Sequence, residues 1–110
     1  MAADPRPCLS VVVPCYNERN TILELLDKVL ESPWVAEAVV VDDGSKDGTR
    51  DLLAGVTDPR IQVRLHEVNQ GKGAALRTGF SHATQPYVVV QDADLEYDPS
   101  EYELLLEPLL

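Results

Sequence analysis

Residues 87–94 join an apolar, β-branched run directly to two carboxylates. The run from Tyr87 to Val90 is continuous, which is typical of a parallel strand covered on both faces and central in its sheet. Ligands of open α/β sheets bind beyond the carboxyl ends of the strands, where Asp92 and Asp94 lie. Two carboxylates so close repel each other unless a cation such as Mg²⁺ separates them. Taken alone, the stretch fits a solvated acidic turn equally well.

Along the rest of the chain, segments with the apolar pattern of a strand alternate with segments that have the apolar period of a helix. Expected strands cover residues 9–14, 36–41, 61–65 and 87–91, and expected helices cover 22–30, 49–56, 74–83 and 101–110. The strand at 61–65 alternates apolar and polar residues, so we expect it nearer an edge. In the third helix we expect Leu76, Phe80 and Ala83 to face inward. This order predicts an α/β fold, a Rossmann-like parallel sheet with helices on both faces.

A chain of 110 residues is one domain at most. We expect residues 1–8 to be a flexible tail and 9–110 to be the domain. A net charge of −10 argues against nucleic acid as a partner. The apolar runs are too short to span a membrane, and residues 1–7 lack the apolar core of a signal peptide. Cys8 and Cys15 flank one strand, too far apart to bridge, so we expect free thiols and a cytoplasmic protein.

Polar loops follow three of the expected strands, at residues 14–18, 42–45 and 92–96. In a parallel sheet all three fall on one edge, and three carboxylate-bearing loops there indicate a binding site. The segment 71–73, Gly-Lys-Gly, opens a helix and fits two interpretations equally: a phosphate contact through Lys72 and backbone N–H groups, or a turn with a solvated lysine. His66 and His82 lack partners for a catalytic triad or zinc site, so we interpret both as structural or surface groups.

Four segments together resemble the family 2 glycosyltransferases of the GT-A fold, with the strongest likeness to polyprenyl-phosphate (dolichyl-phosphate) mannose or glucose synthases. The likeness covers nearly the whole chain from Leu9. The segments are Val-Val-Pro-Cys-Tyr-Asn-Glu (12–18), Val-Val-Asp-Asp-Gly-Ser-Lys-Asp-Gly-Thr (40–49), Asn-Gln-Gly-Lys-Gly (69–73) and Gln-Asp-Ala-Asp-Leu (91–95).

The resemblance implies a nucleotide-binding role for the first two segments. Pro14, Tyr16 and Glu18 would line the nucleotide, and Val41 and Asp43 would hold the base and its neighbourhood.

The last segment would be the family's DxD motif. Asp92, Ala93 and Asp94 would lie against the nucleotide diphosphate with Mg²⁺ or Mn²⁺, and Glu96 would complete the metal shell. A divalent ion stabilises the charge that develops on such a leaving group. No residue is assigned as the catalytic base.

The function implied is transfer of a sugar from UDP-glucose or GDP-mannose, by metal-assisted inverting displacement, to an acceptor. The expected acceptor is a polyprenyl phosphate, which would bring the protein to the inner face of a membrane. Family members continue for at least as many residues again and build the acceptor site there. We therefore expect 9–110 to be the nucleotide-sugar-binding half, truncated relative to the family.

Two alternatives remain open. One is a nucleotide- and metal-binding module, or inactive fragment, without turnover. The other is a receiver or phosphatase with clustered aspartates, which the end of the first strand, Pro14 to Tyr16, disfavours because those folds place key aspartates there. Apolar residues such as Leu105 and Leu106 in the last helix, with an open sheet edge beside residues 87–91, predict self-association.

Overall fold

The computed structural model describes residues 6–93, Pro99 and Tyr102. Asp94, Glu96 and the helix expected at 101–110 lie outside these residues. So do residues 1–5 of the expected tail. Cys8, assigned to that tail, is buried, and its backbone N–H donates to the Trp34 carbonyl at 3.0 Å. Packing therefore begins at least one residue before the expected domain boundary.

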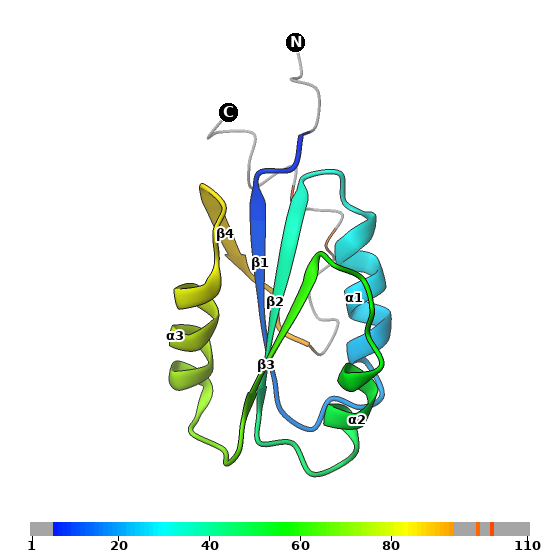
Figure 1. Cartoon of the computed structure of the whole chain (residues 1–110), viewed down its shortest axis with the longest axis vertical. Coiled ribbons are helices and arrows are strands. Elements are labelled where there is room, and N and C mark those ends of the chain that lie inside the picture. Colours follow the sequence, from blue (N-terminus) through cyan, green and yellow to red (C-terminus); the bar gives the residue numbers. More distant parts are fainter. Residues whose placement is uncertain (1–5, 94–98, 100–101, 103–110) are drawn as a thin grey trace.

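Strands and helices alternate in the predicted order (Figure 1). Each predicted element within the described residues is present, and no end is shifted by more than two residues. The elements are β1 (Leu9–Cys15), α1 (Ile22–Glu31), β2 (Val35–Asp43), α2 (Thr49–Ala54), β3 (Ile61–His66), α3 (Lys72–His82) and β4 (Tyr87–Val90).

The four strands form one parallel sheet in the order β3-β2-β1-β4. Val12 in the middle of β1 pairs with Val39 of β2 on one side and with Val90 of β4 on the other. Helices α1 and α2 lie on one face of the sheet and α3 on the other (Figure 1). The predicted fold class, a Rossmann-like sheet with helices on both faces, is confirmed.

Successive residues of the central strands face opposite layers, as the two-residue period of a strand requires. Val11, Val13 and Val40 belong to the core beneath α1, whose buried side chains include Leu25 and Leu26. The alternate positions of the same strands face α3; they are Val12, Val39 and Val41. The continuous valine runs are therefore explained by a cover on each face of β1 and β2.

Helix α3 packs on β1 and β2 through small residues. Ala75 and Gly79 are its buried positions, and a Cβ at Gly79 would overlap the Cγ1 of Val12. The prediction that Phe80 faces inward is wrong, because its side chain is 49% exposed. The helix approaches the sheet too closely for a large residue at the contact.

The prediction that residues 87–90 form a central strand is also wrong for the described part of the chain. There, β4 is last in the strand order, and Val88 and Val90 are 44% and 38% exposed. Because α3 lies over β1 and β2, it leaves this face of β4 uncovered. The expected edge position of β3 is confirmed.

Cys8 and Cys15 are free thiols, as predicted. Among the described residues, no helix has the length and apolar character needed to cross a membrane.

Glu37 makes hydrogen bonds to two other segments at the end of the sheet opposite the carboxyl ends of the strands. Its carboxylate accepts hydrogen bonds from the Ser10 hydroxyl, the Thr84 backbone N–H at 2.6 Å and the Thr84 hydroxyl at 2.9 Å. Partial burial opposes ionisation, but these hydrogen bonds outweigh it and hold the Glu37 pKa below its ordinary value of 4.5.

Glu37 should therefore contribute stability that is lost in acid. A carboxyl with a depressed pKa stabilises the fold above its unfolded pKa and stops doing so as pH falls through its folded value. We expect Glu37→Gln to lower the urea midpoint at about pH 7, and the difference from wild type to shrink by about pH 3. Glu24→Gln, on an exposed i,i+4 ion pair with Lys28, is the control and should change little. A constant difference across this range would contradict the assignment.

Candidate functional site

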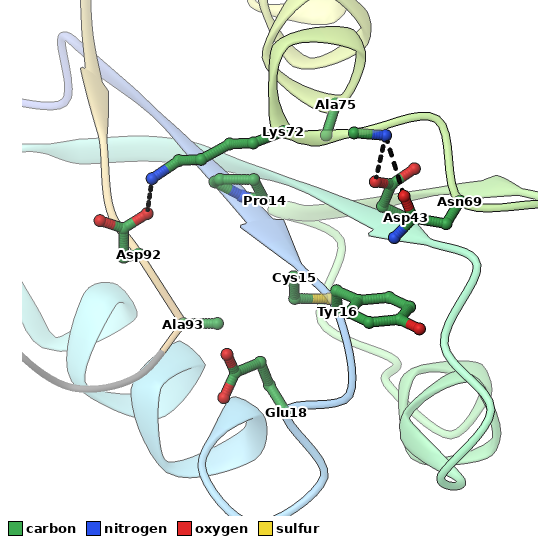
Figure 2. Close-up of a pocket in the computed structure, with 11 residues that line it drawn as sticks. Pro14, Cys15, Tyr16, Glu18, Asp43, Asn69, Lys72, Ala75, Asp92 and Ala93 are labelled. Atoms are coloured by element: carbon green, nitrogen blue, oxygen red, sulfur yellow. Dashed lines mark hydrogen bonds and ion pairs between the residues drawn. The ribbon is translucent and has the colours of Figure 1, made fainter.

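A cavity of about 610 Å³ opens at the edge of the sheet where the strands end. Its walls come from the ends of β1 and β2, the start of α3 and the residues after β4 (Figure 2). Seven of the residues predicted for the site line it: Pro14, Tyr16, Glu18, Asp43, Lys72, Asp92 and Ala93. The predicted convergence of three loops on one edge is confirmed.

Val41 is the predicted residue that the structure places elsewhere. Its side chain is fully buried and packs with Val39 and Ala75 beneath α3. Asp94 and Glu96, predicted to hold a metal, lie outside the described residues.

Four pocket residues were not assigned to the site from the sequence. Cys15, Asn69 and Gly71 lie inside segments that carried the family resemblance, and that resemblance could have indicated them as site residues. Ala75 gave no signal of its own. It faces the cavity because it lies about one helical turn after Lys72, on the side of α3 that meets the sheet.

The loops after β1 and β2 are tied to each other. Asn17 has a positive φ of 53°, a conformation that asparagine tolerates better than most residues. Its backbone N–H donates to the Ser45 hydroxyl at 2.8 Å, and its side-chain oxygen accepts from the Lys46 N–H at 2.9 Å. The Glu18 N–H donates to the Thr49 hydroxyl at 3.1 Å. These contacts fix the wall that presents Tyr16 and Glu18.

Adjacent aspartates at the end of β2 have different surroundings. Asp42 is fully buried, lies 3.8 Å from the Arg50 guanidinium and accepts from the Ser45 N–H and from the Cys15 thiol at 3.7 Å. Burial raises the pKa of the Cys15 thiol far above its ordinary value, and the Asp42 carboxylate raises it further. A raised pKa favours the neutral thiol, which is a poor nucleophile.

Asp43 holds the loop that precedes α3. One of its oxygens accepts from the Gln70 N–H and the His66 Nδ1–H, both at 2.9 Å, and the other accepts from the Gly71 N–H at 3.0 Å. Burial opposes ionisation of Asp43, but these hydrogen bonds outweigh it and hold its pKa below the ordinary value. A carboxylate has about four acceptor positions, so about one remains for a ligand.

Lys72 and Asp92 face each other across the cavity. Lys72 is the first residue of α3. Its side chain extends past Pro14, and its ammonium lies 2.8 Å from an Asp92 oxygen (Figure 2). Both side chains are partly exposed, at 60% and 32%, so the pair is accessible to a ligand. Opposite charges at one rim suit a ligand that combines phosphate groups with a cation.

The Asp92 carboxylate fits a divalent cation as one ligand. It is a hard oxygen donor at the cavity rim and already has a positive group within contact distance. Within the described residues there is no cluster of three or more metal-binding side chains. Asp94 and Glu96, the other metal ligands expected from the sequence, follow Asp92 closely but lie outside the described residues.

Thr21 connects the start of α1 to the loop after β4. No motif or spacing in the sequence singled out Thr21. It occupies the N-cap position without capping the helix, and its hydroxyl donates to the Ala93 carbonyl at 2.6 Å. This hydrogen bond fixes the backbone directly after Asp92.

Comparison with known proteins finds that the chain is similar to glycosyltransferases. The family model described as glycosyl transferase family 2 matches residues 10–110. The chain is 37% identical over 109 residues to the undecaprenyl-phosphate 4-deoxy-4-formamido-L-arabinose transferase of Pectobacterium carotovorum, covering 90% of this chain and 32% of that protein. It is 34% identical over 108 residues to the dolichyl-phosphate beta-glucosyltransferase ALG5A of Trichomonas vaginalis, covering 88% and 33%.

Solved structures show the same likeness. The mannosyltransferase PcManGT of Pyrobaculum calidifontis, in complex with GDP-Man and Mn²⁺, matches with a TM-score of 0.70 and 38% identity over 83% of this chain and 28% of that one. Glucosyl-3-phosphoglycerate synthase of Mycobacterium tuberculosis, in complex with Mn²⁺, UDP and glucosyl-3-phosphoglycerate, matches with a TM-score of 0.73 and 30% identity over 94% and 40%. The chain spans about a third of the length of the two curated relatives.

Proposed function

The chain belongs to glycosyltransferase family 2, and on this premise we propose that it binds the nucleotide-sugar donor of a glycosyltransferase. One observation carries the proposal: three loops from separate strands converge on a single cavity whose rim holds both Lys72 and Asp92. The proposed donor is UDP-glucose or GDP-mannose, with the nucleotide against Pro14, Tyr16 and Glu18.

The proposed cofactor is Mg²⁺ or Mn²⁺ held by Asp92 together with Asp94 and Glu96. Two of the structures similar to this chain are complexes with both Mn²⁺ and a nucleotide or nucleotide sugar, which supports a divalent cation here. When bound, the ion would neutralise the charge that grows on the leaving diphosphate. Lys72 would donate hydrogen bonds to the same phosphate oxygens.

The proposed acceptor is a polyprenyl phosphate. The names of two relatives, an undecaprenyl-phosphate transferase and a dolichyl-phosphate glucosyltransferase, support this class. Such an acceptor would bring the protein to the cytoplasmic face of a membrane. Because a phosphate acceptor is already an anion, inverting displacement needs it to be positioned more than it needs a base.

Calorimetric titration tests donor binding. UDP, GDP, UDP-glucose and GDP-mannose are titrated into the chain with Mn²⁺ and again with a chelator. We expect one of the two nucleotide classes to bind, and its affinity to fall about tenfold or more without the metal. If neither class binds in the presence of Mn²⁺, the proposed function is wrong.

A second candidate function is donor binding without transfer. Apart from Ala75, the described residues that line the cavity belong to the four segments that resemble the family, and none is assigned as a catalytic base. Transfer of labelled sugar to undecaprenyl phosphate or dolichyl phosphate in vesicles separates the two candidates. Donor binding without any transfer to either lipid favours the binding module.

A further inference from the structure

His66 lies outside the cavity yet contacts two elements that build it. It is the last residue of β3, and its side chain is only 10% exposed. Its Nδ1 lies 2.9 Å from the Asp43 carboxylate at the end of β2, and its Nε2 lies 2.9 Å from the Thr78 hydroxyl on α3. Because Nδ1 faces a carboxylate it carries the hydrogen, and in the neutral ring Nε2 then accepts from the threonine hydroxyl.

These contacts continue to the cavity through backbone groups. The Asp43 oxygens accept the Gln70 and Gly71 N–H groups, and Lys72 follows immediately. Gly71 has a positive φ of 93°, so the chain turns sharply just before α3 begins. The hydrogen bonds therefore determine where α3 starts and from which point Lys72 reaches over the cavity to Asp92.

We infer that His66 is a positioning residue for nucleoside diphosphate binding. It holds the Asp43 carboxylate against the Gln70 and Gly71 amides, and this places the Lys72 ammonium where the diphosphate binds. The inference rests on the proposed function, because it assumes a nucleoside diphosphate in this cavity. It assigns Asp43 a role through the loop before α3, in addition to any contact with the nucleotide through its remaining acceptor position.

His66→Ala removes both hydrogen bonds and should weaken binding of UDP or GDP, whichever the wild type binds with Mn²⁺, by about tenfold. His66→Asn should recover most of that loss, because its amide nitrogen is the same number of bonds from Cα as Nδ1 and can still donate to Asp43. Thr78→Val keeps the side-chain volume and removes only the hydroxyl, so it should weaken binding in the same direction but less. His82→Asn, at the chain's other histidine, is the control and should bind as wild type does.

Two further measurements separate positioning from a general loss of structure. Amide hydrogen exchange should show faster exchange at Gln70 and Gly71 in His66→Ala, with the protection of β1 and β2 unchanged. In a double-mutant cycle, His66→Ala should change the diphosphate affinity less than about twofold in the Lys72→Met background, since its effect acts through Lys72.

Unchanged protection at Gln70 and Gly71, or equal effects of His66→Ala with and without Lys72, would overturn the inference. Wild-type diphosphate affinity in His66→Ala would overturn it as well and would leave the proposed function standing. A wild-type chain that binds neither UDP nor GDP with Mn²⁺ contradicts the proposed function, and the inference with it.

Discussion

Gly44→Ala should lower the free energy of unfolding by about 3 kcal/mol, the largest stability effect we expect at the cavity edge. Gly44 has a positive φ of 77°, which strains any residue with a Cβ. A Cβ there would also lie 2.5 Å from the Asn69 backbone nitrogen and 2.8 Å from the Val68 carbonyl carbon. Both atoms belong to backbone, so no side-chain rotation can relieve the overlap.

Gly48→Ala is the matched control. Its φ of 101° lies in the left-handed region and carries a similar conformational strain, but the nearest atom to a Cβ there would be in the Arg19 side chain, at an ordinary contact distance of 3.6 Å. We expect it to cost only about 1–2 kcal/mol. Urea denaturation of the two variants and the wild type measures the difference. Equal losses would show that the approach of the loop after β2 to the loop before α3 is not what requires Gly44.

Asp94→Asn should weaken Mn²⁺-dependent nucleotide binding by tenfold or more, which corresponds to about 1.4 kcal/mol. The reason is the pairing of Asp94 with Asp92 after β4, because removing one carboxylate removes a charged oxygen ligand from the proposed metal site. Calorimetry with Mn²⁺ and with a chelator gives the metal-dependent part of the affinity. Asp27→Asn, at an exposed position of α1, is the control for loss of one negative charge.

Asp94→Asn and Asp27→Asn should differ in nucleotide affinity only when the metal is present. With a chelator, Asp94→Asn should bind the nucleotide about as the wild type does. If it also matches the wild type with Mn²⁺, Asp94 is not a ligand in the proposed site.

The order of elements could be predicted because each strand and helix has a distinct apolar period. For β4 an open edge was expected beside the strand, but which of its faces would be covered could not be predicted. A continuous apolar run indicates that a strand will be covered on both faces, but it does not identify the covering element. Helix α3 packs over β1 and β2 through Ala75 and Gly79, and this close contact determines that Val88 and Val90 are left exposed. In the sequence, small residues indicate a buried helix face less strongly than a large apolar residue does. Phe80 was therefore wrongly predicted to face inward.

The site was predicted best where the strands end. Val41 and Asp43 lie two positions apart in β2, so both point to the face that α3 covers. Val41 is buried under Ala75, whereas Asp43 lies far enough along the strand to reach the loop before α3. Sequence periodicity gives the shared face but not where the covering helix begins.

His66 shows a different limit of the sequence. Its interpretation as a structural or surface group was right in part, since it is held by hydrogen bonds within the fold. Its partners, however, come from β2 and α3, which are distant in sequence. No local pattern indicates that Asp43, His66 and Thr78 will meet.

The central place of β1 in the sheet has a consequence for the order of folding. Val12 pairs with Val39 and with Val90, and the second partner lies about three times as far along the chain. Closing the longer loop costs about 1 kcal/mol more in chain entropy, so β4 should join a β1–β2 nucleus late. Asp92 directly follows β4, so the ion pair between Lys72 and Asp92 forms only when that strand docks. The rate at which nucleotide-binding competence appears during refolding should therefore report the last docking step, separately from the earlier collapse of the valine core.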